Sequence, residues 1–427
     1  MSRRAVVVGA GLTGMAVKSH LEQLGFIVDV IDDAGTQVSD EGVEALVRDA
    51  DLVYPSAGVP PRHPAWRFAL AHDVPVVGEF DLAQRASDVP IIAVTASNGK
   101  TTVTTLVTEM LKASGMAAVA AGNIGFPLIE AVKGDHEIVV AEASSFQLYA
   151  TKEFRAFVAL WANASPNHLD WHGNYDDYLD AKARIYRNQG RDDFSVANKV
   201  DPRTLEAASV SGARLVTFGP GGNFFSDGTA LRGSLTSSAE KIVSLSELPR
   251  SLPHDIDNAL AALAVAAAAG ADLEAAAGTL RLFAGLPHRV ELVGEAGGVR
   301  WYNDSKATTP ESVLAAVAGF DSVVLIAGGR NKGVDLSVMA GQAQRVRAVV
   351  AVGEAAGEVT AAFEGSTPVT QADSMTEAVT RAGCLARSGD VVLLSPGCAS
   401  FDWYGSYIER GEDFRLAVEA LTGRIEA

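Results

Sequence analysis

The chain has 427 residues, of which 48% are hydrophobic and 20% are charged. This length exceeds what one hydrophobic core usually holds, so we expect two or three globular domains. The formal net charge of −17 argues against a broad basic face that binds nucleic acid, and a polyphosphate ligand would have to meet a local cluster of positive groups.

The first segment, up to about residue 80, is predicted to be an α/β unit. A helix that runs to Leu24 follows the first of its predicted strands, which are Ala5–Val8, Phe26–Ile31, Leu52–Tyr54 and Pro75–Val77. The N-terminal apolar run resembles a signal peptide only superficially. Glycines interrupt the run and a second strand follows at once, so we interpret it as part of the mature fold.

Three glycines after the first predicted strand form the pattern Gly9-x-Gly11-x-x-Gly14. With Asp32 or Asp33 about twenty residues on, this matches the dinucleotide fingerprint. The physical requirement is only that a diphosphate meets a helix N-terminus. NAD and a UDP-linked substrate satisfy it equally, and a glycine turn without a ligand remains an alternative.

The second segment opens with a stronger motif. The apolar run Pro90–Val94 leads into Thr95-Ala96-Ser97-Asn98-Gly99-Lys100-Thr101-Thr102 and then a helix-like stretch. Backbone amides, a helix N-terminus and the Lys100 ammonium would hold phosphates, and the Thr101 hydroxyl is placed to hold Mg²⁺. The full P-loop pattern needs glycine at position 94, where this chain has valine. We still favour nucleotide binding over a plain turn.

Two further sets of polar residues follow predicted strands. The strand Glu137–Ala141 ends in Glu142, where Mg²⁺ beside a phosphate loop needs an oxygen ligand, although a lone glutamate is usually a solvated strand end. The strand Ala156–Trp161 leads to His168, and Lys182 follows on an amphipathic helix. A surface histidine and a solvated lysine are the ordinary interpretations unless something independent ties them together.

The remainder of the chain continues the α/β pattern. Residues 190–250 alternate short apolar runs with Gly, Asp and Ser, and a helix is predicted at Asn258–Ala269. The alanine-rich stretch there is too short to span a bilayer, so we expect no membrane partner. The third segment repeats a strand followed by a loop at Val323–Ala327, Val349–Val352 and Val391–Leu394. The two cysteines, Cys384 and Cys398, cannot form a disulfide framework, which favours a reducing cytoplasm.

Several motifs in fixed order tie these residues together. They are Ser97–Thr102, Glu142–Leu148, Asn167–His172, Ala181–Tyr186, Gly285–Arg289, Asn303–Thr308, Ser395–Asp402 and Arg410–Phe414. Over essentially the whole chain the sequence resembles the Mur ligase family of cell-wall enzymes, and Ser144–Leu148, Asn303–Thr308, Ser395–Asp402 and Arg410–Phe414 point to the member that adds D-glutamate.

The resemblance implies an α/β fold with three domains. These are a Rossmann-like UDP-substrate domain at 1–80, a P-loop ATPase-like central domain at 81–285 and a Rossmann-like amino-acid domain at 286–427. It also implies the reaction. ATP phosphorylates the carboxylate of UDP-N-acetylmuramoyl-L-alanine (UDP-MurNAc-L-alanine), and the amine of D-glutamate attacks the acyl phosphate to form an amide during peptidoglycan precursor synthesis.

The resemblance also implies roles for individual residues. The catalytic set is Lys100, Glu142, His168 and Lys182. The ATP contacts are Ser97, Asn98, Gly99, Lys100, Thr101, Thr102, Asn258, Arg289 and Asp304. The UDP-substrate contacts are Leu12, Thr13, Asp33, Gly58, Asn123, Ser144 and Gln147. The D-glutamate contacts are Lys306, Thr308, Lys332, Ser400, Phe401 and Tyr407.

Two Mg²⁺ sites are implied, with Thr101 and Glu142 at one, and with His168 and a carbamylated Lys182 at the other. An unmodified ammonium cannot bind a metal, whereas a carbamate presents oxygens. We expect a cytoplasmic monomer that acts on small molecules. Ala96 departs from the family pattern, which usually has glycine there, and its methyl group is a candidate to narrow the phosphate approach.

Three alternatives remain. Another Mur enzyme or a folate polyglutamate ligase would share the mechanism, but folate ligases lack the N-terminal glycine unit, and the Asp-Asn-Pro-Arg motif expected for diaminopimelate addition is not found. An NAD-dependent oxidoreductase built on residues 1–150 would leave residues 95–182 unexplained. A catalytically silent nucleotide-binding regulator is disfavoured by the intact Lys100, Glu142, His168 and Lys182.

Overall fold

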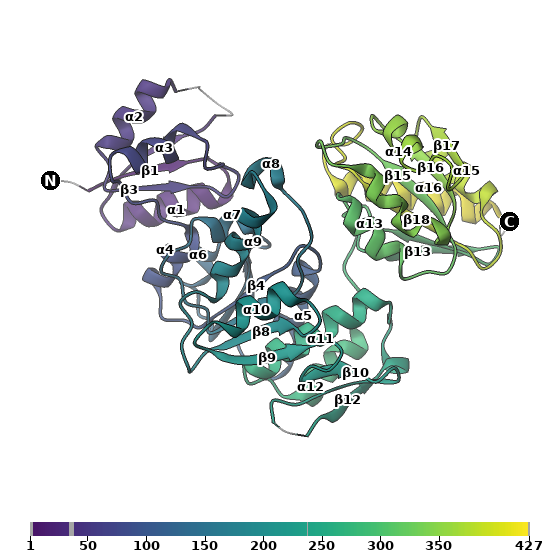
Figure 1. The fold of residues 1–427 in the computed structure, drawn as a ribbon, viewed down its shortest axis with the longest axis horizontal. Helices are drawn as coiled ribbons and strands as arrows, with labels where there is room; N and C mark the ends of the chain where they lie inside the picture. Colours follow the sequence, from purple (N-terminus) through teal and green to yellow (C-terminus); the bar gives the residue numbers. More distant parts are fainter. Residues whose placement is uncertain (1–2, 34–37, 237, 426–427) are drawn as a thin grey trace. The chain divides into compact units, whose positions relative to one another are not determined.

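The computed structural model describes residues 3–33, 38–236 and 238–425. The chain forms two compact units, the first from residues up to 249 together with 256–283, and the second from residues 250–255 together with those from 284 onward. Figure 1 shows the elements of both units. Among the described helices, none is long and apolar enough to cross a membrane. The predicted division at residues 80 and 285 stays a prediction.

The first unit begins with a small parallel sheet of strand order β2-β1-β3. Its strands and the helices that follow them are β1 (Arg4–Val8), α1 (Leu12–Gln23), β2 (Ile27–Ile31), α2 (Asp40–Arg48), β3 (Leu52–Pro55), α3 (Pro64–Ala71) and α4 (Glu79–Ala86). The predicted strand Pro75–Val77 is wrong. It pairs with β3 only through a single bridge between Val53 and Val76, because the chain turns into α4 directly afterwards.

A nine-stranded sheet forms the rest of the first unit, in the order β12-β11-β10-β9-β8-β7-β4-β6-β5. Its strands are β4 (Ile91–Thr95), β5 (Ala118–Gly122), β6 (Ile138–Glu142), β7 (Val158–Trp161), β8 (Phe194–Asn198), β9 (Arg214–Phe218), β10 (Phe224–Ser226), β11 (Ala230–Gly233) and β12 (Glu240–Ser244). All neighbouring pairs from β5 to β10 are parallel, and β10, β11 and β12 pair antiparallel. The alternating segment 190–250 therefore builds one end of this sheet.

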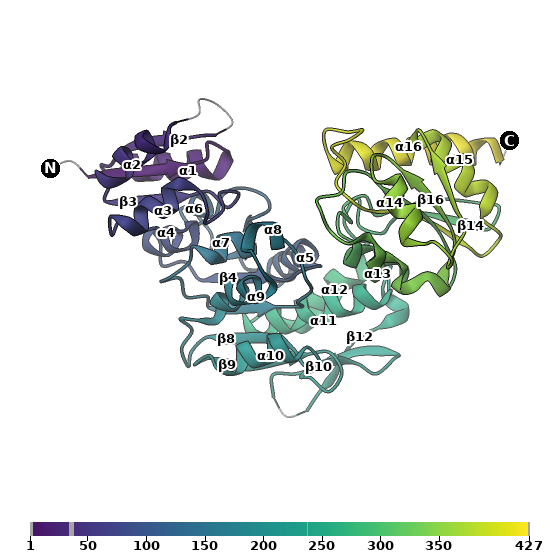
Figure 2. The same cartoon turned by 45° about the horizontal axis from the view of Figure 1, so that its top comes forward.

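Helices connect these strands and cover the sheet. They are α5 (Lys100–Ala113), α6 (Leu128–Ala131), α7 (Ser145–Tyr149), α8 (Leu169–His172), α9 (Tyr175–Ala183), α10 (Pro202–Ser209), α11 (Pro253–Ala268) and α12 (Leu273–Leu282), with short 3₁₀ helices at Arg184–Tyr186 and Leu245–Glu247. Helix α12 packs against α5 (Figure 2).

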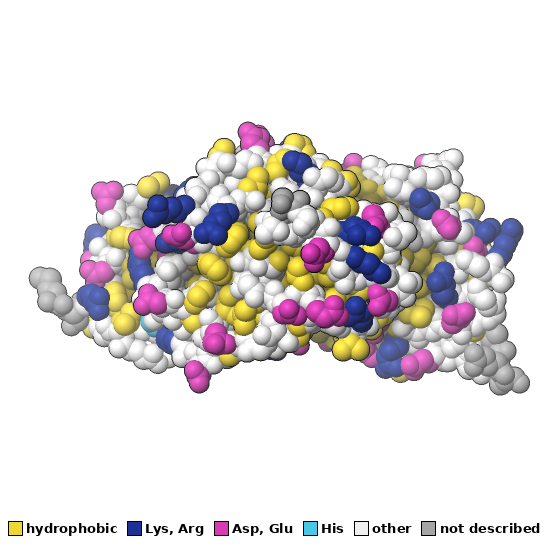
Figure 3. Space-filling model, turned by 90° about the horizontal axis from the view of Figure 1, so that it is seen from below, with side chains coloured by type: hydrophobic (Ala, Val, Ile, Leu, Met, Phe, Trp, Pro, Cys, Tyr) yellow, Lys and Arg dark blue, Asp and Glu magenta, His cyan; other side chains and the backbone are white. Residues whose placement is uncertain are grey.

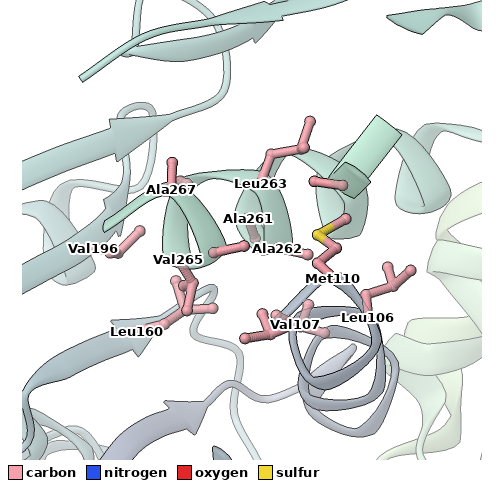
Figure 4. Packing of buried hydrophobic residues seen from close by; sticks show 14 of the residues in the cluster. Leu106, Val107, Met110, Leu160, Val196, Ala261, Ala262, Leu263, Val265 and Ala267 are labelled. Atoms are coloured by element: carbon pink, nitrogen blue, oxygen red, sulfur yellow. The ribbon is translucent and has the colours of Figure 1, made fainter. Parts of the chain in front are cut away.

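Small side chains of α11 form part of the hydrophobic core that packs against the nine-stranded sheet. Figure 4 shows Ala261, Ala262 and Val265 of this helix packed with side chains of α5, including Val107 and Met110. Alanine lets the helix approach its neighbours closely, and each fully buried Leu or Val side chain contributes about 1.5–3 kcal/mol by leaving water. This packing fixes the helix whose N-terminal part carries Asn258.

The second unit contains a six-stranded sheet of order β13-β14-β18-β15-β16-β17, in which only the β13–β14 pair is antiparallel among the described strands. Its elements are β13 (Glu291–Ala296), β14 (Val299–Asn303), α13 (Pro310–Val317), β15 (Val323–Gly328), a kinked 3₁₀ segment (Leu336–Arg345), β16 (Val346–Val352), α14 (Ala356–Ala362), β17 (Val369–Ala372), α15 (Met375–Leu385), β18 (Val391–Gly397) and α16 (Tyr407–Ile425). The loops after the parallel strands meet at one edge, as expected from the sequence.

The surface carries charges of both signs. On the face shown in Figure 3, Lys and Arg side chains are scattered among Asp and Glu side chains and apolar groups. The described basic side chains on that face form no continuous stripe of the kind that tracks a nucleic-acid backbone.

Candidate active site

The predicted phosphate loop joins the end of β4 to the start of α5. Gly99, directly before the helix, has a φ of +87°, in the left-handed region that favours glycine. A Cβ atom at Gly99 would lie 2.3 Å from Asn258 Oδ1, so the glycine also allows α11 to place Asn258 against the loop. The structure thus brings together two parts of the predicted ATP site that are far apart in sequence.

Side chains from two other elements brace this loop. Asn163, just after β7, accepts hydrogen bonds from the N–H groups of Ser97 and Asn98 at 3.0 Å each, and donates to the Asn98 carbonyl at 2.9 Å. Tyr178 on α9 shares a 2.7 Å hydrogen bond with the Ser97 hydroxyl. The sequence analysis missed both residues, although Asn163 stands two residues after a predicted strand and Tyr178 stands one helical turn before Lys182.

Two lysine side chains donate to the same backbone carbonyl. Lys100 Nζ lies 2.8 Å from the Ala96 oxygen and 3.1 Å from the Ser97 oxygen. Lys182 Nζ also lies 2.8 Å from the Ala96 oxygen, and 3.0 Å from Thr95 Oγ1. The ordinary interpretation of Lys182 as a solvated charge is wrong, because the residue is only 1% exposed.

Burial changes the acid–base chemistry of Lys182. Removal from water and the nearby positive charge of Lys100 lower its pKa well below the usual value for lysine, while the negative charge of Glu142 acts in the opposite direction. The neutral amine form is therefore more populated at Lys182 than on a surface lysine. Ala96 is also fully buried, and its methyl group belongs to the hydrophobic cluster that includes Val103 and Leu106 of α5.

Glu142 ends β6 next to β4, at the edge where the phosphate loop begins. Its Oε1 accepts a 2.7 Å hydrogen bond from Asn123 Nδ2. Its Oε2 is buried, and within the described part of the chain it has no hydrogen-bond partner. A buried carboxylate oxygen without a donor suits a cation. No group of three His, Cys, Asp or Glu side chains placed for a metal ion occurs among the described residues.

His168 occupies the position before the short helix α8, with a left-handed φ of +56°. Its ring meets Phe146 edge-on, with ring centroids 4.6 Å apart. The neighbouring His172 is a buried member of the same aromatic cluster, and its Nε2 lies 2.9 Å from the Ser145 hydroxyl. Burial, with a smaller contribution from Lys182, lowers the pKa of His172 to about 4, so this ring is neutral at pH 7.

The glycine motif at the end of β1 has two positions that require glycine. Gly9 has a φ of +97°, and a Cβ atom at Gly14 would lie 2.0 Å from the Gly9 carbonyl oxygen. Of the predicted UDP-substrate residues in this region, Leu12 and Thr13 start α1, Asp33 pairs with His63 Nε2 at 3.2 Å, and Gly58 follows β3.

The predicted substrate residues of the central sheet engage one another. The Ser144 hydroxyl accepts a hydrogen bond from the backbone N–H of Gln147. The side-chain oxygen Oε1 of Gln147 accepts from the backbone N–H and the hydroxyl of Ser144, and these bonds together cap α7. Gln147 Nε2 donates to the buried Glu79 at 3.2 Å. Burial raises the pKa of Glu79, and hydrogen bonds from Gln147 and two backbone amides act in the opposite direction. Glu79 is another residue that sequence analysis missed.

In the second unit, the predicted nucleotide residues Arg289 and Asp304 lie on neighbouring segments. His288 and Val290, on either side of Arg289, have left-handed φ values of 60° and 46°. Asp304 is buried, and its carboxylate accepts from the Ser395 hydroxyl at 2.8 Å and from the Val290 N–H at 3.3 Å. Burial raises the pKa of Asp304 to about 7, despite the opposing effects of these hydrogen bonds and of Arg289.

Most of the predicted D-glutamate residues lie on loops at the carboxyl edge of the second sheet. Lys306 Nζ lies 4.0 Å from the ring centroid of Tyr407. Ser400 is buried after β18, its neighbour Phe401 is exposed, Thr308 follows β14, and Lys332 follows β15. The guanidinium of the buried Arg410 donates to the Ser305 hydroxyl, the Ser305 carbonyl and the Cys398 carbonyl, at 2.8–3.1 Å. These bonds tie two of the loops together.

The fold and the braced loop define an α/β protein with a predicted phosphate loop between a strand and a helix, and comparison with known proteins identifies its class. A Mur ligase middle domain model matches residues 94–266, and a Mur ligase, glutamate ligase domain model matches residues 288–398. The first match contains the phosphate loop, Glu142, His168, Lys182 and Asn258.

Relatives match this chain over nearly the whole length of both chains. UDP-N-acetylmuramoylalanine–D-glutamate ligases from Pelotomaculum thermopropionicum and Desulfatibacillum aliphaticivorans are 39% and 41% identical, each over 98% of both chains. The chain belongs to the Mur ligase family, which confirms the resemblance seen in the sequence. Among solved structures, UDP-N-acetylmuramate-alanine ligase MurC from Thermotoga maritima superposes with a TM-score of 0.61 at 19% identity, covering 99% of this chain and 100% of that one. A pseudomurein peptide ligase from Methanothermus fervidus gives 0.65 at 14% identity, covering 98% and 100%. These two show the shared fold.

Proposed function

We propose that this protein is an ATP-dependent ligase that joins D-glutamate to UDP-MurNAc-L-alanine in peptidoglycan precursor synthesis. One observation carries the proposal: a phosphate loop, a buried lysine and an orphaned carboxylate oxygen occur together in a chain that matches D-glutamate ligases over 98% of its length. The NAD-dependent oxidoreductase alternative gives no role to this centre.

The first step is attack of a substrate carboxylate oxygen on the γ-phosphorus of ATP, with ADP as the leaving group. Both reactants are anionic, so the site must supply positive charge. The Lys100 ammonium, which donates to two loop carbonyls, would meet phosphates bound at the start of α5, and the amides in the first turn of that helix would add positive potential. Asn163 and Tyr178 keep the loop in the shape that this requires.

In the second step the amine of D-glutamate attacks the carbonyl carbon of the acyl phosphate. The tetrahedral intermediate then expels phosphate, which carries away one oxygen of the original carboxylate. We assign Lys306, Thr308, Lys332, Ser400, Phe401 and Tyr407 to D-glutamate, where ammonium and hydroxyl groups meet its carboxylates. Arg289, Asp304 and Asn258 contact the nucleotide, and Leu12, Thr13, Asp33, Gly58, Asn123, Ser144 and Gln147 hold the UDP substrate.

Thr101 and Glu142 would hold one Mg²⁺, and His168 and Lys182 a second. The orphaned Oε2 of Glu142 fits this assignment. Divalent cations bound there would reduce the repulsion between ATP and the substrate carboxylate. For Lys182 to act as a ligand it must carry a carbamate, which forms from CO₂ and a neutral amine. The burial that lowers the pKa of Lys182 supports this modification.

The protein is proposed to act as a monomer in the cytoplasm on these small molecules, with separate domains at 1–80, 81–285 and 286–427. The absence of a disulfide pattern in the two-cysteine sequence supports this location.

Phosphate release tests the proposal. The enzyme is given Mg·ATP and UDP-MurNAc-L-alanine with D-glutamate, L-glutamate, L-lysine or diaminopimelate as the acceptor. Turnover with D-glutamate alone is expected. Turnover with another acceptor would assign the chain to a different Mur reaction, and no turnover with any acceptor would support the silent regulator.

A further inference from the structure

The loop that carries Lys332 is anchored by the two residues that precede this lysine. Arg330 lies two residues after the end of β15 and pairs with Ala399 through two backbone hydrogen bonds of 2.9 and 3.0 Å. This bridge connects the Lys332 loop to the segment that carries Ser400. Gly329 permits the approach, because its φ is +126° and a Cβ atom there would lie 2.3 Å from the Ala399 carbonyl oxygen.

The side chain of Arg330 makes a second attachment. Its Nε and a terminal nitrogen donate to the two carboxylate oxygens of Glu354, at 2.9 and 2.7 Å. The backbone N–H of Glu354 donates to the Asp402 carboxylate at 3.1 Å. The guanidinium lowers the pKa of Glu354, so the pair is fully ionised at neutral pH. Three loops after β15, β16 and β18 are therefore joined at one edge of the sheet (Figure 1).

The side chain of Asn331, the residue directly before Lys332, bridges the loop to Val334, beyond Lys332. Its Oδ1 accepts from the Val334 N–H at 3.0 Å, and its Nδ2 donates to the Val334 carbonyl at 3.0 Å and to Glu358 on α14 at 2.6 Å. Lys332 itself is exposed. A flexible, exposed lysine gains precision only from the backbone that presents it, and here the two residues before Lys332 are both attached to the segment after β16.

We propose that Arg330 is a positioning residue for D-glutamate, which acts through its ion pair with Glu354 to hold the Lys332 loop against the Ser400 segment. The proposal rests on the D-glutamate ligase function proposed above. Neither Arg330 nor Glu354 was among the residues that the motifs singled out. Both side chains are about half exposed, so the pair contributes little to overall stability, and its effect is expected in the geometry of the loop.

A charge swap tests this role. In Arg330→Glu, the new carboxylate faces Glu354 and Asp402, and the KM for D-glutamate is expected to rise about three- to fivefold, the factor that an exposed ion pair can supply. The KM values for ATP and UDP-MurNAc-L-alanine are expected to stay unchanged. Glu354→Arg is expected to give the same selective effect, and the double variant is expected to recover most of the affinity for D-glutamate.

The pair Arg381–Glu377 offers a matched control. It is a similarly exposed ion pair, and it lies within helix α15. Arg381→Glu is expected to leave all three KM values unchanged. An unchanged KM for D-glutamate in Arg330→Glu, an equal rise for all three substrates, or no recovery in the swapped variant would overturn the proposal. Failure of the ligase function would show separately, as a wild-type enzyme that does not turn over D-glutamate.

Discussion

Replacing Gly99 with alanine separates the conformational role of this glycine from its role in placing Asn258. The left-handed φ of +87° costs a residue with a Cβ atom about 1–2 kcal/mol. The added methyl group would also begin 2.3 Å from Asn258 Oδ1, so the Asn258 side chain must move away. Because an amide at the end of a side chain can rotate, we expect this movement to lose a nucleotide contact rather than to unfold the protein.

Gly115, just after the C-terminus of α5, provides a control with the same backbone strain. Its φ is +86°, and no heavy atom lies within 4 Å of a Cβ atom built there. Both alanine variants are expected to lower the thermal midpoint by a similar amount, roughly 2–8 °C. Only Gly99→Ala is expected to lower kcat/KM for ATP, by about tenfold or more, as for the loss of a hydrogen bond to a charged group.

Thermal unfolding and steady-state phosphate release on the two purified variants provide the comparison. An unchanged kcat/KM for ATP in Gly99→Ala would refute the assignment of Asn258 to the nucleotide. An equal loss of kcat/KM for ATP in Gly115→Ala would show that backbone strain at either end of α5 is enough to lower activity. The reason for linking Gly99 to Asn258 would then be removed.

Other perturbations probe the remaining parts of the site. Lys182→Ala is expected to lose most activity and to recover part of it with added short carboxylates, and full activity without them would reject the carbamate. Asn163→Ala removes three hydrogen bonds to the loop and should raise the KM for ATP about tenfold, as measured by ATP titration; an unchanged KM would mean that the loop keeps its shape without Asn163. The pKa of Asp304 is about 7 in the folded protein and 3.8 when the chain is unfolded. The contribution of its protonated carboxyl to stability therefore falls as the pH rises from about 4 to 7. The thermal midpoint of the wild type minus that of Asp304→Asn should therefore decrease between pH 4 and 7 and level off above, and a difference that is flat with pH would contradict the burial of this carboxyl.

The sequence predicted the α/β architecture because its strands are apolar runs that end in glycine or polar loops. The segment 190–250 was harder, because its strands are short and each buries only part of its residues. The predicted strand Pro75–Val77 failed for a different reason. Its composition suits a strand, but strand length is decided by where the next helix starts, which local propensity does not encode.

For the candidate site, the motifs predicted which residues matter but not what surrounds them. Lys182 was recognisable only by resemblance, because nothing in an amphipathic helix marks one lysine as buried. Asn163, Tyr178 and Glu79 contact site residues across large sequence separations, which a one-dimensional pattern does not reveal. The sequence also did not show that the methyl group of Ala96 belongs to the buried hydrophobic cluster around α5.

The most direct test of the central claim follows an oxygen atom. UDP-MurNAc-L-alanine labelled with ¹⁸O in its carboxylate is incubated with the enzyme, Mg·ATP and D-glutamate, and the phosphate and the nucleotide product are analysed by mass spectrometry. Transfer through an acyl phosphate predicts one ¹⁸O in each phosphate released and a UDP product enlarged by one glutamyl residue. Unlabelled phosphate, or release of AMP and pyrophosphate, would contradict the account.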